Sequence, residues 1–204
     1  MVLNPLFPLL LLRWRVARVE VARAAFNADT VGPCVPHGSR VLDVGAWDAR
    51  TAALLRDERG CDVLAVDVVD KNVTDVPFGL FDGITLPVAD GSRDVVTLLY
   101  VLHHAADDLA LLREARRVLA PGGRVLVAED MVQTAAQRLV TVGFHVWLWL
   151  WTWMGWAGQF RRFDAWTARF AEAGLRVVER RELGSHLGRA LWPKNVLFVL
   201  QADD

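Results

Sequence analysis

The chain has 204 residues, of which 53% are apolar, and a formal net charge of -1. This length suits one large domain with a substantial core. The near-neutral charge argues against the basic surface that nucleic-acid binding uses, so we expect no nucleic-acid partner. The two cysteines, Cys34 and Cys61, lack both the spacing of a zinc site and the density of a disulfide scaffold, and a reducing cytoplasm fits them.

Residues 1–36 form an apolar N-terminal segment ahead of the main domain, which we expect to cover residues 37–204. Leu6 to Leu12 is strongly apolar, and the arginines follow it, at positions 13, 15, 18 and 23. A secretory signal carries its basic residues before the apolar run, so this order argues against secretion. We interpret the segment as an amphipathic, arginine-rich helix that either packs on the domain or lies at a membrane surface.

From Arg40 onward, short apolar runs alternate with helical stretches. The predicted strands are residues 40–44, 62–66, 94–100 and 124–128, with a short extended segment before Phe81; the predicted helices are residues 49–59 and 107–119. We expect Asp48 to cap the first helix and Gly60 to end it. Asp107 or Asp108 should cap the second helix, and Pro121-Gly122-Gly123 should break it before the strand at Arg124. Such alternation implies a parallel sheet with helices on both faces, a doubly wound α/β fold.

The C-terminal part departs from this alternation. A predicted helix over residues 164–173 stops at Gly174 and is followed by two apolar extended runs, residues 175–181 and 195–201. Because these runs are close in sequence, we expect them to form an antiparallel hairpin.

Acidic residues follow three successive predicted strands or extended segments. Asp43 and Asp67 come at the ends of the first two, and Asp82 follows the third. Open α/β sheets bind ligands beyond the carboxyl ends of their strands, and a carboxylate in the position of Asp67 can accept hydrogen bonds from the two hydroxyls of a ribose. Gly45 permits a tight turn and a close ligand approach. For each residue alone, a capping or turn role is the alternative.

Six short motifs follow one another along the chain: Val41 to Asp48, Asp67, Phe81-Asp-Gly83, Leu86 to Asp94, Leu102-His-His104 and Arg117 to Gly123. Their order resembles that of class I S-adenosylmethionine-dependent methyltransferases, in particular the small bacterial branch called methyltransferase type 11. The resemblance covers residues 40–130 well and continues more weakly over residues 163–200. It implies a Rossmann-like, seven-stranded sheet, mostly parallel with an antiparallel last strand, and S-adenosylmethionine as the cofactor.

The resemblance also implies which residues contact the cofactor. Asp43 and Gly45 would line its methionine end, Asp67 would hold the ribose hydroxyls, and Asp82 would accept a hydrogen bond from the adenine amino group. The other implied cofactor-binding residues are Ala46, Trp47, Val68, Gly83, Leu99 and Tyr100.

The glycine-rich turn departs from the family pattern, because Trp47 and Ala49 replace its second and third glycines. The cofactor has no pyrophosphate that would demand them. The main rival, a nicotinamide-dependent Rossmann enzyme, needs Gly-x-Gly-x-x-Gly for its pyrophosphate, and only Gly45 meets that fingerprint. The Trp47 indole either packs on the cofactor and walls its pocket or has a purely structural role.

His103 and His104 follow the predicted strand 94–100 at the edge of the expected site. Methyl transfer is an in-line displacement, and a base is needed only if the acceptor must lose a proton. We hypothesise that one histidine is this base or positions the acceptor, with Glu129 and Asp130 as weaker candidates. The structural alternative is a histidine hydrogen-bonded in a helix-entry turn. Two adjacent histidines without further ligands do not predict a metal site.

A Trp-rich insertion at residues 139–160 is the least family-like part. Leu139 to Gly158 has no Asp, Glu, Lys or Arg, and it contains five tryptophans. The segment is long enough to cross a bilayer, but strands of one sheet are predicted on both sides of it. A single crossing would divide that sheet between two compartments. We therefore expect a helix that is apolar nearly all round and must be covered.

Three coverings of the insertion remain open: a lid over a lipophilic acceptor, a contact with a membrane interface, or a protein contact such as a homodimer. Trp147, Trp151 and Trp153 are the candidate acceptor-binding residues. We predict a methyltransferase of a small hydrophobic or aromatic acceptor, cytoplasmic and at most peripheral to the membrane. The alternative is a catalytically silent cofactor-binding or scaffold protein on the same fold.

Overall fold

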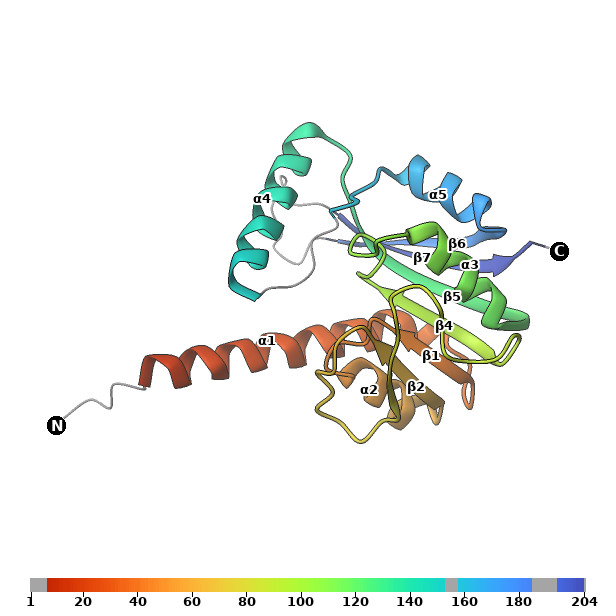
Figure 1. Cartoon of the computed structure of the whole chain (residues 1–204), viewed down its shortest axis with the longest axis horizontal. Coiled ribbons are helices and arrows are strands. Elements are labelled where there is room, and N and C mark those ends of the chain that lie inside the picture. Colours follow the sequence, from red (N-terminus) through yellow and green to blue (C-terminus); the bar gives the residue numbers. More distant parts are fainter. Residues whose placement is uncertain (1–6, 153–157, 185–193, 204) are drawn as a thin grey trace.

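The structure is a computed structural model that describes residues 7–152, 158–184 and 194–203; for residues 7–17, 147–152 and 184 it describes the backbone only. Its centre is a seven-stranded sheet in the order β3-β2-β1-β4-β5-β7-β6 (Figure 1). The strands are β1 (Arg40–Val44), β2 (Asp62–Asp67), β3 (Phe78–Leu80), β4 (Arg93–Leu99), β5 (Leu119–Met131), β6 (Leu175–Gly184) and β7 (Lys194–Ala202). The first five pair in parallel, whereas β7 is antiparallel to both β5 and β6. This topology confirms the predicted sheet and its antiparallel last strand.

Helices cover the sheet on both faces, which confirms the doubly wound α/β class. The helices are α1 (Phe7–Val31), α2 (Arg50–Arg59), α3 (Asp108–Val118), α4 (Ala135–Thr152) and α5 (Phe163–Glu172), with a short 3-10 turn η1 (Gly32–Cys34). α1 packs against α2, and α3 packs against α5. The two pairs belong to two separate apolar clusters, one on each face of the sheet.

The alternation of side chains along each strand divides the core between the two faces. In β4, Val95 joins the cluster that contains Leu55 of α2, while Val96 joins the cluster that contains Phe170 of α5. All four of these side chains are buried, and full burial of one such side chain stabilises the fold by about 1.5 to 3 kcal/mol. A parallel sheet buried on both faces is thus a rigid support for the loops at its carboxyl ends.

Two predicted boundaries, at α2 and β5, need correction, and a third, at α3, is decided between two candidates. α2 begins at Arg50 with Ala49 as its N-cap residue, so Asp48 lies one position too early to be the cap, although its carboxylate still accepts the Arg50 N–H at 3.2 Å. Of the two predicted caps of α3, Asp107 is confirmed, because its side chain accepts the Ala110 N–H. β5 begins at Leu119 and includes the Pro-Gly-Gly segment, because Leu119 already pairs with the start of β4.

α4 and the N-terminal part of α1 both lie beyond the carboxyl ends of the parallel strands (Figure 1). α4 forms most of the connection from β5 to α5, which is where the Trp-rich insertion was expected. Among the described residues, no helix combines the length and the apolarity that a membrane crossing requires.

Candidate active site

The turn between β1 and α2 holds three residues in the left-handed backbone region. Gly45, Trp47 and Ala49 have φ angles of 70°, 52° and 59°. Left-handed backbone is easy for glycine and strained for other residues. Trp47 and Ala49 occupy the positions where the family pattern has glycine, so the turn keeps the conformation that favours glycine although two of its glycines are replaced. Such strain is commonly found at functional sites.

Gly45 is required at its position for a second reason. Its N–H donates to the Val66 carbonyl at 2.8 Å, which draws the turn against the end of β2. A Cβ atom on this glycine would lie 2.4 Å from Cγ2 of Val101, in the loop after β4. The close approach therefore joins the loops that follow β1, β2 and β4 into one unit.

Asp67 lies at the end of β2 and is only 7% exposed. One carboxylate oxygen accepts the Trp47 N–H at 2.8 Å, and the other accepts the Val69 N–H at 3.2 Å. A carboxylate has about four acceptor positions, so two positions remain after these bonds. The Asp67 carboxylate could therefore accept hydrogen bonds from two further hydroxyl groups. Val68, the next residue, is exposed beside this carboxylate.

Asp43 is a second buried acid, at the inner side of the same turn. It is 3% exposed, and its carboxylate accepts the Thr97 hydroxyl of β4 at 2.6 Å. Burial raises the pKa of Asp43 to about 6, and the nearby carboxylates of Asp67 and Asp48 act in the same direction, whereas the Thr97 hydrogen bond opposes them. A cationic group in front of this acid would relieve the cost of its ionisation.

Asp82 and Gly83 lie apart from the buried acids, in the exposed loop after β3. The Asp82 carboxylate accepts the N–H groups of Ile84 at 2.8 Å and Thr85 at 2.6 Å. These two hydrogen bonds lower the pKa of Asp82. The acid therefore shapes its own loop at the sheet edge, on the β3 side of Asp67.

Leu99 ends β4 and Tyr100 follows it, next to the β1 turn, and both are half-buried. Tyr100 has a φ of 60°, a further strained position at the carboxyl edge of the sheet. Burial, together with the charges of Asp130 and Glu129, raises the pKa of the Tyr100 phenol. The structure thus gathers the predicted residues Asp43, Gly45, Ala46, Trp47, Asp67, Leu99 and Tyr100 at adjacent strand ends.

The Trp47 indole has a structural contact. Its Nε1–H donates to the Glu20 carboxylate at 3.2 Å, and Glu20 belongs to α1. This bond ties the N-terminal helix to the β1 turn and supports the reading in which the segment packs on the domain. Packing of the indole on a cofactor stays a prediction.

His103 is buried in the loop between β4 and α3. It is 2% exposed, and its Nδ1 lies 2.6 Å from a carboxylate oxygen of Glu129, which is fully buried at the end of β5. Burial by itself would lower the pKa of His103, but the charge and the hydrogen bond of Glu129 together raise it above the ordinary value. Glu129, a weaker candidate from the sequence, is thus the partner of His103.

Two residues that the sequence analysis missed complete this part of the site. His145 of α4 and Phe160 of the following segment lie against His103, with ring centroids 5.3 Å and 5.1 Å from it. His145 Nδ1 lies 2.9 Å from the Thr141 carbonyl oxygen, and burial lowers the pKa of His145. A signal that could have identified His145 is its position as a lone imidazole within an insertion whose residues 139–158 contain no Asp, Glu, Lys or Arg.

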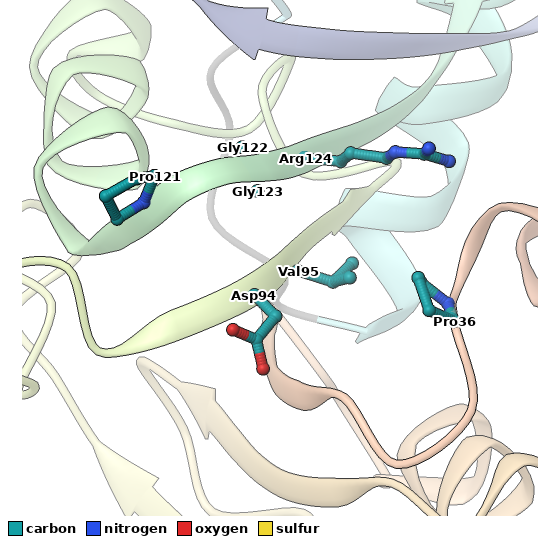
Figure 2. Close-up of a pocket in the computed structure, with 7 residues that line it drawn as sticks. All are labelled: Pro36, Asp94, Val95, Pro121, Gly122, Gly123 and Arg124. Atoms are coloured by element: carbon teal, nitrogen blue, oxygen red, sulfur yellow. The ribbon is translucent and has the colours of Figure 1, made fainter.

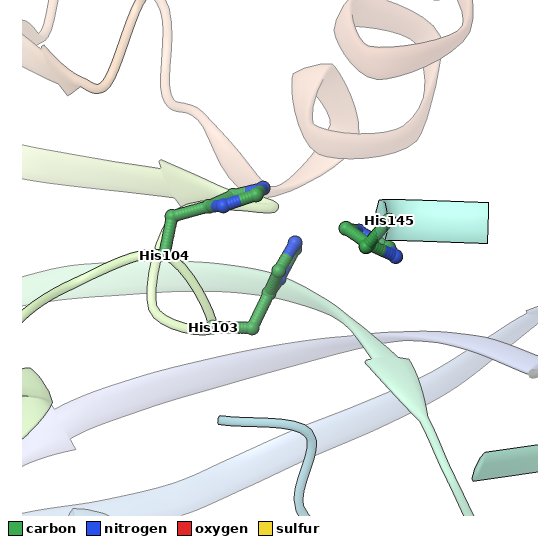
Figure 3. Close-up of side chains that lie close together, drawn as sticks. All are labelled: His103, His104 and His145. Carbon is green, nitrogen blue, oxygen red and sulfur yellow. The ribbon is translucent and has the colours of Figure 1, made fainter. Parts of the chain in front are cut away.

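The three histidines lie around a common space (Figure 3). His103 and His104 come from one loop, with ring centroids 4.1 Å apart, and His145 approaches from α4 at 5.6 Å from His104. One potential ligand nitrogen of each histidine lies within 4.8 Å of the others. His104 and His145 are half-buried.

The segment that follows the described part of α4 is held firmly over this loop. The Gln159 N–H donates to the His103 carbonyl at 3.1 Å, and the Gln159 side chain donates to the Ala105 carbonyl at 3.2 Å. Arg161 donates twice to one carboxylate oxygen of Asp108, at 2.9 Å and 2.7 Å. These bonds connect the insertion to the loop that carries the histidines.

The predicted acceptor-binding tryptophans remain predictions. Trp147 and Trp151 lie on the backbone of α4, but their side chains fall outside the described residues. Trp153 falls outside them altogether.

A separate pocket lies at the other edge of the sheet, where β4 and β5 begin (Figure 2). It has a volume of about 160 Å³ and is lined by Pro36, Asp94, Val95, Pro121, Gly122, Gly123 and Arg124. Pockets for small-molecule ligands commonly measure about 300 to 1,000 Å³. This opening is too small for a nucleotide-type cofactor, and it lies away from the buried acids and histidines.

The fold and the strand-end residues together define a class I methyltransferase domain. Residues 42–127 match the family model described as a methyltransferase domain. Solved structures agree on the fold: the YcgJ protein from Bacillus subtilis has a TM-score of 0.67 and 17% identity, over 88% of this chain and 99% of that one. A methyltransferase structure from Bacillus halodurans has a TM-score of 0.67 and 14% identity, over 87% of this chain and 99% of that one.

Curated relatives carry methyltransferase names. A demethylmenaquinone methyltransferase from Beutenbergia cavernae is 36% identical over 116 residues, which are 53% of this chain and 48% of the relative. The 27-O-demethylrifamycin SV methyltransferase of Amycolatopsis mediterranei is 28% identical over 177 residues, 77% of this chain and 61% of the relative. The chain thus spans about half the length of the first of these and about three-fifths of the second. Residues 42–127 thus match the methyltransferase domain family, and the sheet has the Rossmann-like fold of the class I, S-adenosylmethionine-dependent methyltransferases.

The family implies S-adenosylmethionine as the cofactor, and the residues present fit it. Asp67 retains acceptor positions for two hydroxyls, and Asp43 offers a buried carboxylate to a cationic group. The cofactor carries both kinds of group, a ribose and a positively charged methionine end.

Proposed function

We propose that the protein transfers a methyl group from S-adenosylmethionine to a small, hydrophobic or aromatic acceptor. The observation that carries the acceptor side of this proposal is the contact of α4 with the loop after β4. His145 and Phe160 pack on His103 there, directly beyond the carboxyl ends of β4 and β5. The insertion that supplies them has no Asp, Glu, Lys or Arg between Leu139 and Gly158. An apolar acceptor suits such a wall.

The division of labour follows from the two halves of the site. Asp67 would hold the ribose hydroxyls, and Asp43 would face the methionine end. The bound cofactor supplies an activated methyl group. The loop from Tyr100 to His104 would hold the acceptor in line with that group, and most of the rate gain would come from this alignment. The names of the relatives, which refer to demethylmenaquinone and demethylrifamycin SV, support a small-molecule acceptor.

His103 would position the acceptor through its side chain, held in one orientation by Glu129. The carboxylate accepts from Nδ1–H and so directs Nε2 away from β5. A buried, fixed imidazole of this kind can accept a hydrogen bond from an acceptor hydroxyl.

The closest alternative is a cofactor-binding or scaffold protein that lacks turnover. One observation favours this alternative: Trp47 and Ala49 have strained backbone and replace glycines of the family pattern in the turn after β1. A membrane-peripheral location remains part of the proposal for α1 and α4, which expose Val19 and Leu139.

Calorimetry with S-adenosylmethionine tests the cofactor half. We expect Asp67→Asn to weaken binding about 10- to 100-fold, because a hydrogen bond to a charged group contributes about 1.5 to 3 kcal/mol. Asp62→Asn is the matched control, since Asp62 is an exposed acid at the other end of the same strand. Equal affinity of the two variants would contradict the role of Asp67.

Turnover with a library of aromatic and aliphatic acceptors then separates the enzyme from the scaffold. Methylated product that requires an intact Asp67 supports the enzyme. Tight cofactor binding with no product from any acceptor would support the scaffold.

A further inference from the structure

The cluster formed by His103, His104 and His145 has the composition of a metal site. Three imidazoles are a common ligand set for zinc and other late transition metals, and a three-histidine set leaves a fourth position open. Among the described residues, these are the side chains whose potential ligand nitrogens all lie within 4.8 Å of one another. The third histidine comes from α4, so the set exists only in the folded chain (Figure 3).

The surroundings of two histidines are those of metal ligands. His103 Nδ1 lies 2.6 Å from the Glu129 carboxylate, and His145 Nδ1 lies 2.9 Å from the Thr141 carbonyl oxygen. A carbonyl oxygen only accepts, so His145 Nδ1 carries the hydrogen, and the carboxylate favours the same tautomer for His103. Metal-binding histidines almost always donate their second N–H to a carboxylate or a backbone carbonyl in this way. Each neutral ring then keeps an electron pair on Nε2.

The geometry is close to that of a bound site. Imidazole nitrogens stand about 2.0 to 2.1 Å from zinc, which puts two tetrahedral ligands about 3.4 Å apart. The ligand nitrogens lie within 4.8 Å of one another, so the widest pair has to close by at most roughly 1.4 Å. His104 and His145 are half-buried, so side-chain rotation can supply this movement. Phe160 packs on His103 and His145 and forms an apolar wall beside the cluster.

We propose that His103, His104 and His145 bind one divalent transition-metal ion of the zinc type, with Glu129 and the Thr141 carbonyl as the groups that orient two of the ligands. The fourth coordination position would take an oxygen atom of the acceptor or a water molecule, and His103 would then position the acceptor through the metal ion, because its Nε2 is a metal ligand. This last role rests on the proposed methyl transfer, whereas the binding of the metal does not.

Titration with Co²⁺ alone tests the proposal, because tetrahedral Co²⁺ gives a visible spectrum that reports its ligands. The full chain is used without an affinity tag and after treatment with a chelator. We expect one Co²⁺ per chain, displaced by one equivalent of Zn²⁺. His145→Gln should weaken Co²⁺ binding by at least about 100-fold, and Glu129→Gln should weaken it about 10- to 100-fold.

His37→Gln is the matched control, because His37 is exposed in the turn before β1 and lies outside the cluster. Thermal unfolding followed by circular dichroism checks that each variant is folded, and His104→Gln replaces His145→Gln if the latter is not. Absence of stoichiometric Co²⁺ binding would overturn the proposal. So would equal affinities of the cluster variant and His37→Gln.

Calorimetry with S-adenosylmethionine on the same metal-free protein separates the two claims. If the protein binds S-adenosylmethionine but no Co²⁺, the metal site is refuted and the proposed function stands. Metal binding without cofactor binding would do the reverse.

Discussion

The proposed cofactor half and the proposed acceptor half of the candidate site are built in different ways. The cofactor half lies at the ends of β1, β2 and β3, and its key contacts join residues within short loops or neighbouring strands, as between Asp67 and Trp47. The acceptor half lies at the ends of β4 and β5, and it depends on α4 and on residues 158–161, which return to the loop after β4. Local turns therefore position the first half, whereas tertiary contacts assemble the second.

The halves also differ in how they hold buried charge. Asp43 and Asp67 are satisfied by a hydroxyl and by backbone N–H groups, which leaves them as acids ready for a ligand. Glu129 is paired with an imidazole, and Asp108 is paired with two guanidinium groups. The acceptor half thus uses ion pairs to fasten its segments together. Each of the following predictions perturbs a contact in one half and measures the effect on stability or on cofactor affinity.

The largest expected effect comes from Asp108, which is fully buried between Arg161 and Arg169. The double variant Arg161→Ala with Arg169→Ala leaves this carboxylate buried without either guanidinium. We expect a loss of about 3 to 5 kcal/mol in the free energy of unfolding, measured by urea denaturation.

The single variants form a matched pair, because both arginines bind the same carboxylate. Arg161→Ala should raise hydrogen exchange around residues 158–161 and His145, and Arg169→Ala should raise it in α5. Both should leave the affinity for S-adenosylmethionine within about threefold of the wild type. A large loss of affinity in either single variant would show that the two halves are not independent.

Asp43 gives the cofactor half a pH dependence of opposite sign to that of an ordinary paired acid. Its folded pKa of about 6 lies above the ordinary value of 3.8, so its contribution to stability is fully present below the unfolded pKa and is lost as the pH rises through about 6. The gap corresponds to roughly 3 kcal/mol. As the pH rises from about 4 to about 7.5, the free energy of unfolding of Asp43→Asn should therefore rise by roughly 3 kcal/mol relative to that of the wild type.

Denaturation curves at several pH values measure this difference. Thr97→Val is the companion variant, because it removes the hydrogen bond that holds the pKa of Asp43 down. In this variant, the pH at which the stability contribution of Asp43 is lost should be higher. A difference between Asp43→Asn and the wild type that does not change with pH would contradict the prediction.

Gly45 and Gly38 separate backbone strain from close packing. Their φ angles are 70° and 72°, but an added Cβ meets Val101 at 2.4 Å only at Gly45, and at Gly38 it meets nothing within 4 Å. Both alanine variants should lose about 1 to 2 kcal/mol from left-handed backbone. Gly45→Ala should lose a further 1 to 3 kcal/mol, roughly, from overpacking, together with cofactor affinity. Equal unfolding energies for the two variants would refute the close approach.

The smallest expected effect concerns the tie between α1 and the β1 turn. Trp47→Phe removes the hydrogen bond to Glu20 and should cost about 1 kcal/mol of unfolding free energy. A double-mutant cycle with Glu20→Ala, which removes the acceptor, measures the coupling between the two side chains. A coupling near zero would mean that α1 is held to the domain by other contacts.

Much of the cofactor half could be predicted because its determinants are local. The alternation of apolar runs and helices predicted the sheet, and acids at successive strand ends predicted Asp43 and Asp67. The predicted antiparallel hairpin is also correct, since two extended runs close in sequence pair as β6 and β7. The cap of α2 was wrong by one residue because the left-handed Ala49 extends the turn, and this conformation has no signature in an alanine.

Only part of the acceptor half could be predicted from the sequence. The sequence itself pointed to His103, His104 and Glu129 as candidates and marked residues 139–160 as an insertion. The tertiary structure alone decided that His145 and Phe160 meet His103 and that Asp108 fastens the segment through Arg161. Strand and turn patterns arise from neighbours along the chain, whereas a contact between two loops depends on how the whole sheet and its helices pack. The sequence therefore determined the fold and the cofactor end of the site, and tertiary packing determined the histidine cluster.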